Sequence, residues 1–132
     1  MKPRESAENY LETILVLSKN GGQVRSIDIV NELEFTKPSV SVAMKNLRAD
    51  GYITMDCGGF ITLTESGRKI AEAMYERHMI ISDWLIYLGV DKTTAEKDAC
   101  MMEHDMSEQS FSAIHKHLLD WKQGVFKTKN TI

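Results

Sequence analysis

The sequence predicts a mainly α-helical chain in which three short helices and a two-stranded hairpin precede a longer, all-helical region. Three observations lead to this prediction. Apolar residues recur at helical spacing through most of the 132 residues. Short β-type runs interrupt that spacing only around residues 52–63. A wide apolar stripe then resumes and continues to about residue 121.

The first two helices are predicted from their apolar spacing and from the residues at their ends. The first covers about Ser6 to Lys19, and the run Asn20–Gly22 is expected to stop it. Ser26 is the expected N-cap of a short second helix, because serine accepts a hydrogen bond from a first-turn amide. The inward residues of this second helix are predicted to be Ile27, Val30 and Leu33.

The third helix and the hairpin complete a recognisable order of elements. Thr36 is expected to cap a helix over Lys37–Arg48. Two β-type runs, 52–55 and 60–63, flank the turn residues Asp56–Gly59 and predict a hairpin. Helix, helix, turn, helix and hairpin is the order of a winged helix-turn-helix, with the hairpin as its wing.

Three more helices are predicted in the second half of the chain. Thr64 is expected to cap a long helix over residues 66–88, which Gly89 ends. A second helix covers residues 92–105, and Ser107 caps a third one. The predicted domains are therefore a winged helix-turn-helix over 1–65, an all-α domain over 66–121 and a flexible basic tail over 122–132.

The apolar surface of the second domain is too large for three helices to cover alone. Burial against a second copy in a symmetric dimer would cover this surface. It would also place the third predicted helix of each copy on one DNA duplex, at half-site spacing. The residues expected at that interface are Trp84, Met101, Met102 and Phe111.

Composition limits the partners and the compartment. The net charge of −3 means that any DNA contact must depend on local positive patches. No apolar run approaches the length of a membrane span, and the first residues lack the apolar core of a signal peptide. The two cysteines, Cys57 and Cys100, are expected to be free thiols. We therefore expect a cytoplasmic protein without a membrane partner.

The third helix is the candidate DNA-reading element. Its first turn is small and polar, which allows close approach to base edges, and lysines follow. Arg25 and Ser26, at the start of the second helix, are candidate phosphate contacts. The alternative is an ordinary solvated helix face. The candidate contacts around the third helix are Thr36, Lys37, Pro38, Ser39, Ser41, Val42 and Lys45.

A second constellation carries metal-ligand chemistry. Cys100, Glu103 and His104 stand at i, i+3 and i+4, so a helix would present a thiolate, a carboxylate and an imidazole on one face. An isolated His78 precedes them in the long helix. Sulfur, oxygen and nitrogen donors together suit a transition metal rather than calcium or magnesium. Taken singly, each of these residues is more typical of a core or a surface position.

Several longer motifs now match a known family. The chain resembles the diphtheria-toxin-repressor family of metal-dependent transcriptional regulators, which has iron-dependent and manganese-dependent branches. The resemblance extends from about Ala7 to Asp120, and the last of its motifs is the most specific. The motifs are Glu8–Glu12, Thr36–Ser41, Leu63–Gly67, Arg77–His78 and Cys100–Ser107.

The resemblance implies a non-enzymatic regulator in the short, two-domain form that lacks the family's SH3-like domain. It implies a homodimer that binds a palindromic double-stranded operator when a divalent metal is bound, and that represses metal-uptake genes. The metal ligands that it implies are His78, Cys100, Glu103 and His104 from the helical domain, with Glu12 and Asn9 from the first helix.

The chain departs from both branches of the family. Asn9 stands where the manganese branch has aspartate and the iron branch methionine, whereas Glu12 is the manganese-branch residue. Cys100 is the iron-branch residue. At the ancillary site of the iron branch, Ser82 replaces a glutamate, and Glu96 aligns with a histidine that it could replace as an oxygen ligand. Because thiolate is a poor partner for Mn²⁺, the sequence favours Fe²⁺ over Mn²⁺, with Zn²⁺ as a third candidate.

Two other functions fit parts of the pattern. A winged-helix regulator could sense an organic ligand or the redox state without metal, and Cys100 would then be a sensor or core thiol. A metalloenzyme could use the same His, Cys and Glu side chains. The sequence shows no separate nucleophile or general-base arrangement that would support the enzyme.

Overall fold

The computed structural model describes residues 6–131, and the side chains of residues 6–120. It divides into two compact units, the first ending at Tyr75 and the second starting at Glu76. The predicted domain boundary after Glu65 falls at the start of helix α4, whereas the two units divide further along the same helix.

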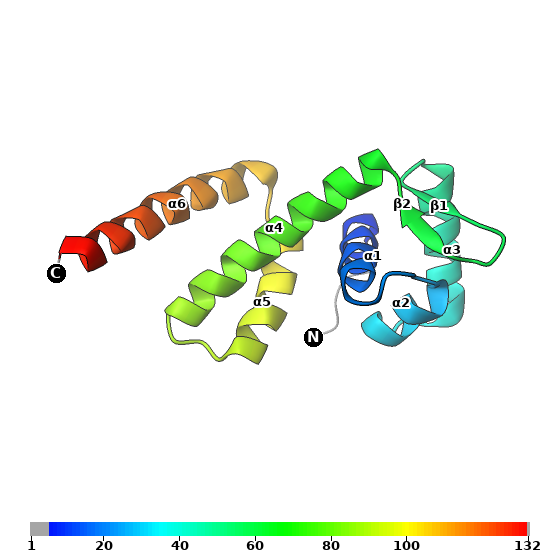
Figure 1. The fold of residues 1–132 in the computed structure, drawn as a ribbon, viewed down its shortest axis with the longest axis horizontal. Coiled ribbons are helices and arrows are strands. Elements are labelled where there is room, and N and C mark those ends of the chain that lie inside the picture. The colour runs from blue at the N-terminus through cyan, green and yellow to red at the C-terminus, as the bar shows by residue number, and fades with distance from the viewer. Residues whose placement is uncertain (1–5, 132) are drawn as a thin grey trace. The chain divides into compact units, whose positions relative to one another are not determined.

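The first unit contains three helices and a two-stranded sheet (Figure 1). The wing is an antiparallel hairpin in which Ile53 faces Leu63 and Met55 faces Ile61. A single bridge from Val24 to Ile61 adds a third short segment to the sheet. The elements are α1 (Ala7–Gly21), α2 (Ser26–Leu33), α3 (Lys37–Ala49), β1 (Ile53–Met55) and β2 (Ile61–Leu63). This order confirms the predicted winged helix-turn-helix.

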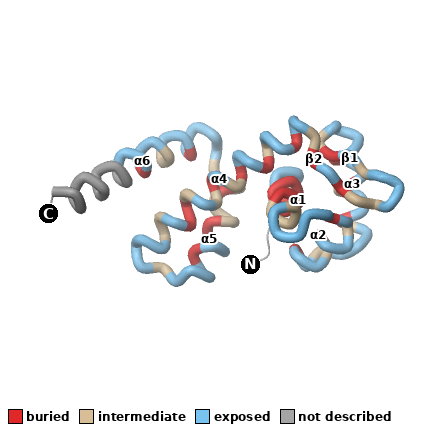
Figure 2. Tube along the Cα trace, viewed as in Figure 1, coloured by how far each residue is buried: buried red, intermediate tan, exposed pale blue. Residues whose placement is uncertain are grey.

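The core of the first unit lies between α1, α3 and the wing. Figure 2 shows buried positions along α1, and these include Leu11 and Ile14, which are fully buried. Val40 of α3 and Ile53 of β1 belong to the same apolar cluster. Burial of these side chains holds α3 at a fixed angle to the wing, and leaves the opposite face of α3 exposed to solvent.

The start of α4 (Glu65–Tyr87) is attached to the wing by hydrogen bonds. The Thr64 hydroxyl donates to the Gly51 carbonyl at 2.7 Å and accepts from the Gly67 amide at 3.2 Å. The Thr64 amide donates to the Tyr52 carbonyl at 3.0 Å. The predicted cap of α4 is therefore confirmed, and the same residue fixes the helix to the two residues that precede β1.

The second unit consists of the later part of α4 with α5 (Lys92–Asp105) and α6 (Glu108–Thr131). Asp91 caps α5 by accepting from the Thr94 amide, and Ser107 caps α6 by accepting from the Ser110 amide. One apolar cluster of this unit joins its three helices through the buried residues Ile81, Ala99 and Phe111. The three predicted helices are thus confirmed.

Four local predictions differ from the structure. Ser26 is the first residue of α2, so Arg25 occupies the N-cap position. Ile27 is 44% exposed, because Ile29 and Leu33 supply the inward face of α2 instead. Phe111 is buried within its own chain rather than available to a second copy. The region predicted as a tail from residue 122 is helical to the end of α6, since low apolar content does not end a helix that lacks proline.

The flexibility predicted for residues 122–132 stays a prediction, and their side chains lie outside the described part of the chain. Among the described residues, no helix combines the length and the apolar character that crossing a membrane requires.

Candidate metal centre and nucleic-acid interface

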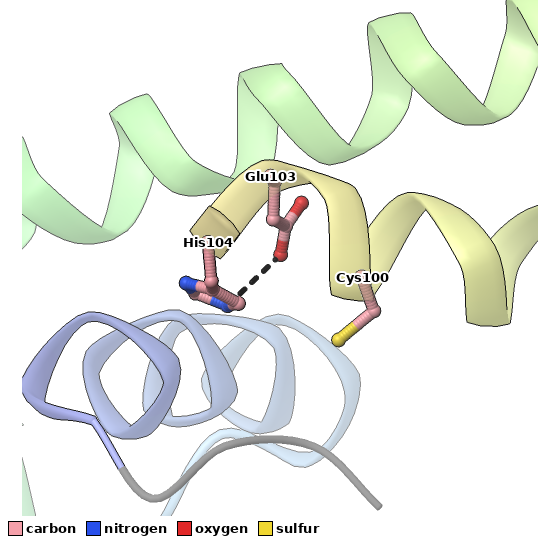
Figure 3. A group of neighbouring side chains, drawn as sticks. All are labelled: Cys100, Glu103 and His104. Carbon is pink, nitrogen blue, oxygen red and sulfur yellow. Dashed lines mark ion pairs between the residues drawn. The ribbon is translucent and has the colours of Figure 1, made fainter. Parts of the chain in front are cut away.

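Helix α5 brings the three predicted donors of its C-terminal half together on one face (Figure 3). Ligand atoms of Cys100, Glu103 and His104 lie within 4.8 Å of one another. This follows from the helical spacing, since residues three and four positions apart are neighbours on a helix surface. The close approach predicted from the spacing of these residues is present in the structure.

Glu103 lies at the centre of this group. Its side chain is 0% exposed, and its two carboxylate oxygens face two histidines. His104 Nε2 lies 3.3 Å from Glu103 Oε1, and His78 Nδ1, on α4, lies 3.4 Å from Glu103 Oε2. The second unit therefore gathers His78, Cys100 and His104 around one buried carboxylate, that of Glu103.

The chemistry of this donor set fits a divalent transition metal. A buried carboxylate requires a compensating positive charge, and a histidine supplies one only when it is protonated. A cation held by thiolate, carboxylate and imidazole would supply that charge at neutral pH. The residues present therefore fit a metal ion, and the carboxylate at their centre is fully buried.

Cys100 is protonated in the metal-free protein. Burial, and then the neighbouring Glu103 charge, raise the pKa of the Cys100 thiol to about 11. At neutral pH, a metal ion that bound the sulfur would have to displace the thiol proton.

We expect metal affinity to rise with pH for this reason. Below the pKa of Cys100, each pH unit should change the affinity by about tenfold, because the bound form has lost a proton that the free form retains. Competition against a chelating indicator between pH 7 and 9 measures the slope. A Cys100→Ser variant is the control, and should show a shallower dependence. Equal slopes for the two proteins would remove the thiolate from the site.

The remaining predicted ligands are distributed as follows. Asn9 and Glu12 lie on α1, in the first unit, where both are buried. Glu96 is exposed on α5, and the clusters of donor atoms found among the described residues do not include it. Ser82, on α4, is buried. The structure therefore gathers only some of the predicted ligands within one unit.

Arg77, which the sequence offered only as part of the Arg77–His78 motif and to which no role was assigned, also lies in this region. It is 7% exposed, and it is the charged member of a stripe that includes the buried residues Met74 and Ile81. A charged residue at helical spacing within an apolar stripe was the signal that could have revealed it.

The candidate nucleic-acid interface is the outer face of α3. Thr36 caps this helix by accepting from the Ser39 amide at 3.2 Å, as predicted. Val42 is 59% exposed, so its apolar side chain is accessible on this face. Ser39 is half-buried, and the other predicted contacts on and before this helix are exposed, namely Thr36, Lys37, Pro38, Ser41, Val42 and Lys45.

A surface hollow of about 530 Å³ lies beside this face of α3. Its lining combines polar and apolar side chains, including Tyr10 of α1 and Asn46 of α3, which the prediction did not include. The predicted contacts that line it are Thr36, Pro38, Ser39 and Val42.

The two predicted phosphate contacts at the start of α2 lie near the wing. The Arg25 guanidinium stacks over the Phe60 ring, 4.2 Å from its centroid, and Arg25 is exposed. The Arg25 amide donates to the Asp28 carboxylate at 2.9 Å. Ser26 is half-buried in the first turn of α2. Stacking on Phe60 orders the arginine side chain while leaving it accessible.

Comparison with known proteins identifies the family. The model of the iron-dependent repressor N-terminal DNA-binding domain matches residues 4–56. The model of the iron-dependent repressor metal-binding and dimerisation domain matches residues 64–123. A curated relative, the transcriptional regulator MntR of Escherichia coli O6:H1 (strain CFT073), is 36% identical over 110 residues, which cover 83% of this chain and 71% of the relative.

The chain belongs to the iron-dependent repressor family. This family consists of metal-dependent, DNA-binding transcriptional regulators, as the sequence resemblance indicated. Its two matched domains correspond to the winged helix-turn-helix and to the helices that follow.

Solved structures of similar proteins support the fold. A manganese-dependent transcriptional repressor in complex with manganese is 25% identical, with a TM-score of 0.77, over 86% of this chain and 52% of that one. ScaR with bound Zn²⁺ is 26% identical, with a TM-score of 0.70, over 88% of this chain and 54% of that one. The chain therefore spans about half the length of these two repressors.

Proposed function

We propose that this iron-dependent repressor family member is a metal-activated repressor of metal-uptake genes, and that its ion is held by Cys100, Glu103, His104 and His78. The observation that carries the proposal is the Glu103 carboxylate, which is fully buried between two imidazoles and beside a thiol. Such a group is more typical of a metal centre than of an ordinary helix interface.

The proposed switch links this site to the DNA-binding domain. Glu12, and with it Asn9, are proposed as further ligands on the basis of the family resemblance. A bound divalent ion would supply the positive charge that the Glu103 carboxylate requires. Residues of α1 that share this ion with residues of α5 would restrict the positions that the winged domain can take, and so favour the arrangement that binds DNA.

We propose Fe²⁺ as the preferred ion. Thiolate is a softer donor than carboxylate, and among divalent first-row metals Mn²⁺ binds a given set of ligands most weakly. Cys100 lies within 4.8 Å of the other α5 donors, close enough for its sulfur to join the same ion.

Mn²⁺ is the second candidate, because a solved structure similar to this chain is described as a manganese-dependent repressor in complex with manganese. Zn²⁺ is a third candidate, since Cys, His and Glu are its usual ligands. The affinities of the protein for the three ions distinguish these candidates.

The test is a competition titration with Fe²⁺, Mn²⁺ and Zn²⁺ against a chelating indicator under anaerobic conditions, using wild type and Cys100→Glu. Wild type should bind Fe²⁺ more tightly than Mn²⁺. The carboxylate variant should shift the preference toward Mn²⁺, because it replaces a soft donor by a hard one. An unchanged preference would exclude Cys100 as the source of selectivity, and absence of binding to wild type would overturn the proposed function.

We also propose a homodimer on a palindromic operator. The second unit exposes several large apolar residues that burial against a second copy would cover. They are Met79, Ile86, Tyr87 and Leu88 in and just after α4, and Leu119 in α6. Two copies related by a two-fold axis would present two α3 helices to successive half-sites of the DNA.

Lys45→Ala should weaken binding to all DNA sequences alike. Lys45 is exposed on α3, where it is proposed to neutralise a phosphate. Losing one phosphate contact should reduce the slope of log affinity against log salt concentration by about 1. Lys97→Ala, an exposed lysine on α5, is the control and should keep the wild-type slope. An unaltered slope in the Lys45 variant would exclude this residue as a phosphate contact.

A further inference from the structure

Arg77 is a buried arginine with partners on both other helices of the second unit. Its Nη1 donates to the main-chain carbonyl of Glu103, on α5, at 3.2 Å. Its Nη2 lies 3.8 Å from the Glu108 carboxylate, in the first turn of α6. The guanidinium also lies over the Phe111 ring, 4.5 Å from the ring centroid. The hydrogen bond to the carbonyl and the contact with the ring fix the position of the guanidinium, whereas the Glu108 side chain is 92% exposed and pairs with it only loosely.

The Glu103 carbonyl lies in the last turn of α5, which ends at Asp105. Carbonyls in the last turn of a helix commonly accept from groups outside the helix. The Arg77 guanidinium, on α4, is such a donor. A positive charge at the C-terminal end of a helix is also favourable for the helix dipole. Arg77 therefore caps the last turn of α5 from outside the helix.

Two successive residues of α4 contact Glu103, one at its main chain and the other at its side chain. Arg77 holds the main-chain carbonyl, and His78 lies 3.4 Å from the carboxylate. The turn that Arg77 caps also contains His104, whose Nε2 lies 3.3 Å from the same carboxylate. A shift of this last turn of α5 would displace two proposed ligands, Glu103 and His104, together.

We propose that Arg77 is a positioning residue of the metal centre, which holds the last turn of α5 so that Glu103 and His104 meet the Cys100 thiol. This inference rests on the proposed metal site. Arg77 acts through the α5 main chain and is not itself a ligand. The Phe111 ring packs against the guanidinium in turn, so the position of the ligands also depends on the first turn of α6.

The direction of the change in metal affinity distinguishes a positioning role of Arg77 from a purely electrostatic one. Arginine carries a positive charge, which repels a metal cation. If Arg77 acted on the site through its charge alone, an uncharged replacement would strengthen metal binding. If Arg77 positions the ligands, the same replacement weakens metal binding.

The experiment is a Co²⁺ titration of Arg77→Met, which keeps much of the apolar volume, and of Arg77→Lys, which keeps the charge. Arg68→Met is the matched control, because Arg68 is an exposed α4 arginine paired only loosely with Glu72, at 3.9 Å. Absorption measures both affinity and the cobalt–thiolate spectrum. Circular dichroism of the metal-free proteins shows whether each variant is folded.

Arg77→Met should raise the Co²⁺ dissociation constant by roughly 10–100-fold, as loss of an outer partner of a metal ligand does. Its cobalt–thiolate spectrum should also change, which a mere loss of global stability would not cause. Arg77→Lys should fall between this variant and wild type, since a lysine cannot reach the carbonyl and stack over the ring as a planar guanidinium does. Arg68→Met should match wild type.

A folded Arg77→Met that binds Co²⁺ as tightly as wild type, or more tightly, with the same spectrum, would overturn the inference. If Arg77→Met does not fold, the inference would be overturned by an Arg77→Lys protein with the Co²⁺ affinity and the spectrum of wild type. Absence of a cobalt–thiolate spectrum from wild type itself would instead overturn the proposed metal site, and this role for Arg77 with it.

Discussion

Glu103→Gln should lower the affinity for the activating metal by more than about 100-fold, because outer partners of metal ligands alone account for roughly 10–100-fold. Glutamine keeps the size of the side chain but removes the negative charge at the centre of the proposed site. The two histidines 3.3 and 3.4 Å away would then face a neutral amide. Operator binding should no longer respond to metal. Competition titration and fluorescence anisotropy measure the two effects.

The matched control is Glu72→Gln, which makes the same chemical change at an exposed position of α4. This variant should bind metal and DNA as wild type does. Circular dichroism and size-exclusion chromatography in chelator check that Glu103→Gln retains the metal-free fold. A folded Glu103→Gln protein with wild-type metal response would show that the buried carboxylate is not part of the site.

Gly67→Ala should destabilise the winged domain by about 3 kcal/mol, at the upper end of the usual range for over-packing. A methyl group at this position would lie 2.9 Å from the carbonyl carbon of Tyr52, and even closer to the carbonyl oxygen. The obstacle is main chain rather than a flexible side chain. Relief would require α4 to move away from Gly51 and Tyr52, to which Thr64 attaches it.

Gly21→Ala is the control for this prediction. A methyl group on Gly21, at the end of α1, would meet nothing within 4 Å, so the substitution should be neutral or slightly stabilising. Urea denaturation in chelator, followed by circular dichroism, compares the two variants. Equal midpoints for Gly67→Ala and wild type would contradict the close approach of α4 to the wing.

The fold could be predicted from the sequence where local signals were strong. Thr36, Thr64 and Ser107 each cap the helix that they were predicted to cap, because their hydroxyls accept from amides three residues later. The start of α2 was less predictable. Arg25 precedes a helix whose third residue, Asp28, accepts from the Arg25 amide, so the capping carboxylate comes from inside the helix.

The metal centre could be predicted only in part. Helical spacing places Cys100, Glu103 and His104 together, whereas His78 approaches them through tertiary packing that spacing does not reveal. No role was assigned to Arg77 for the same reason, since its contacts with Glu103, Glu108 and Phe111 join three different helices. The burial of Phe111 also depends on that packing, and this made it a poor candidate for a dimer contact.

The proposed switch depends on coupling between metal binding and DNA binding. Its most direct test is anaerobic fluorescence anisotropy with a duplex from upstream of the protein's own gene, in chelator and then with Fe²⁺, Mn²⁺ or Zn²⁺. We predict operator binding that is roughly 5–150-fold tighter with the activating metal, which corresponds to a coupling free energy of about 1–3 kcal/mol. Equal affinity in chelator and in metal would contradict the account, and would favour a winged-helix regulator that responds to an organic ligand or to redox state.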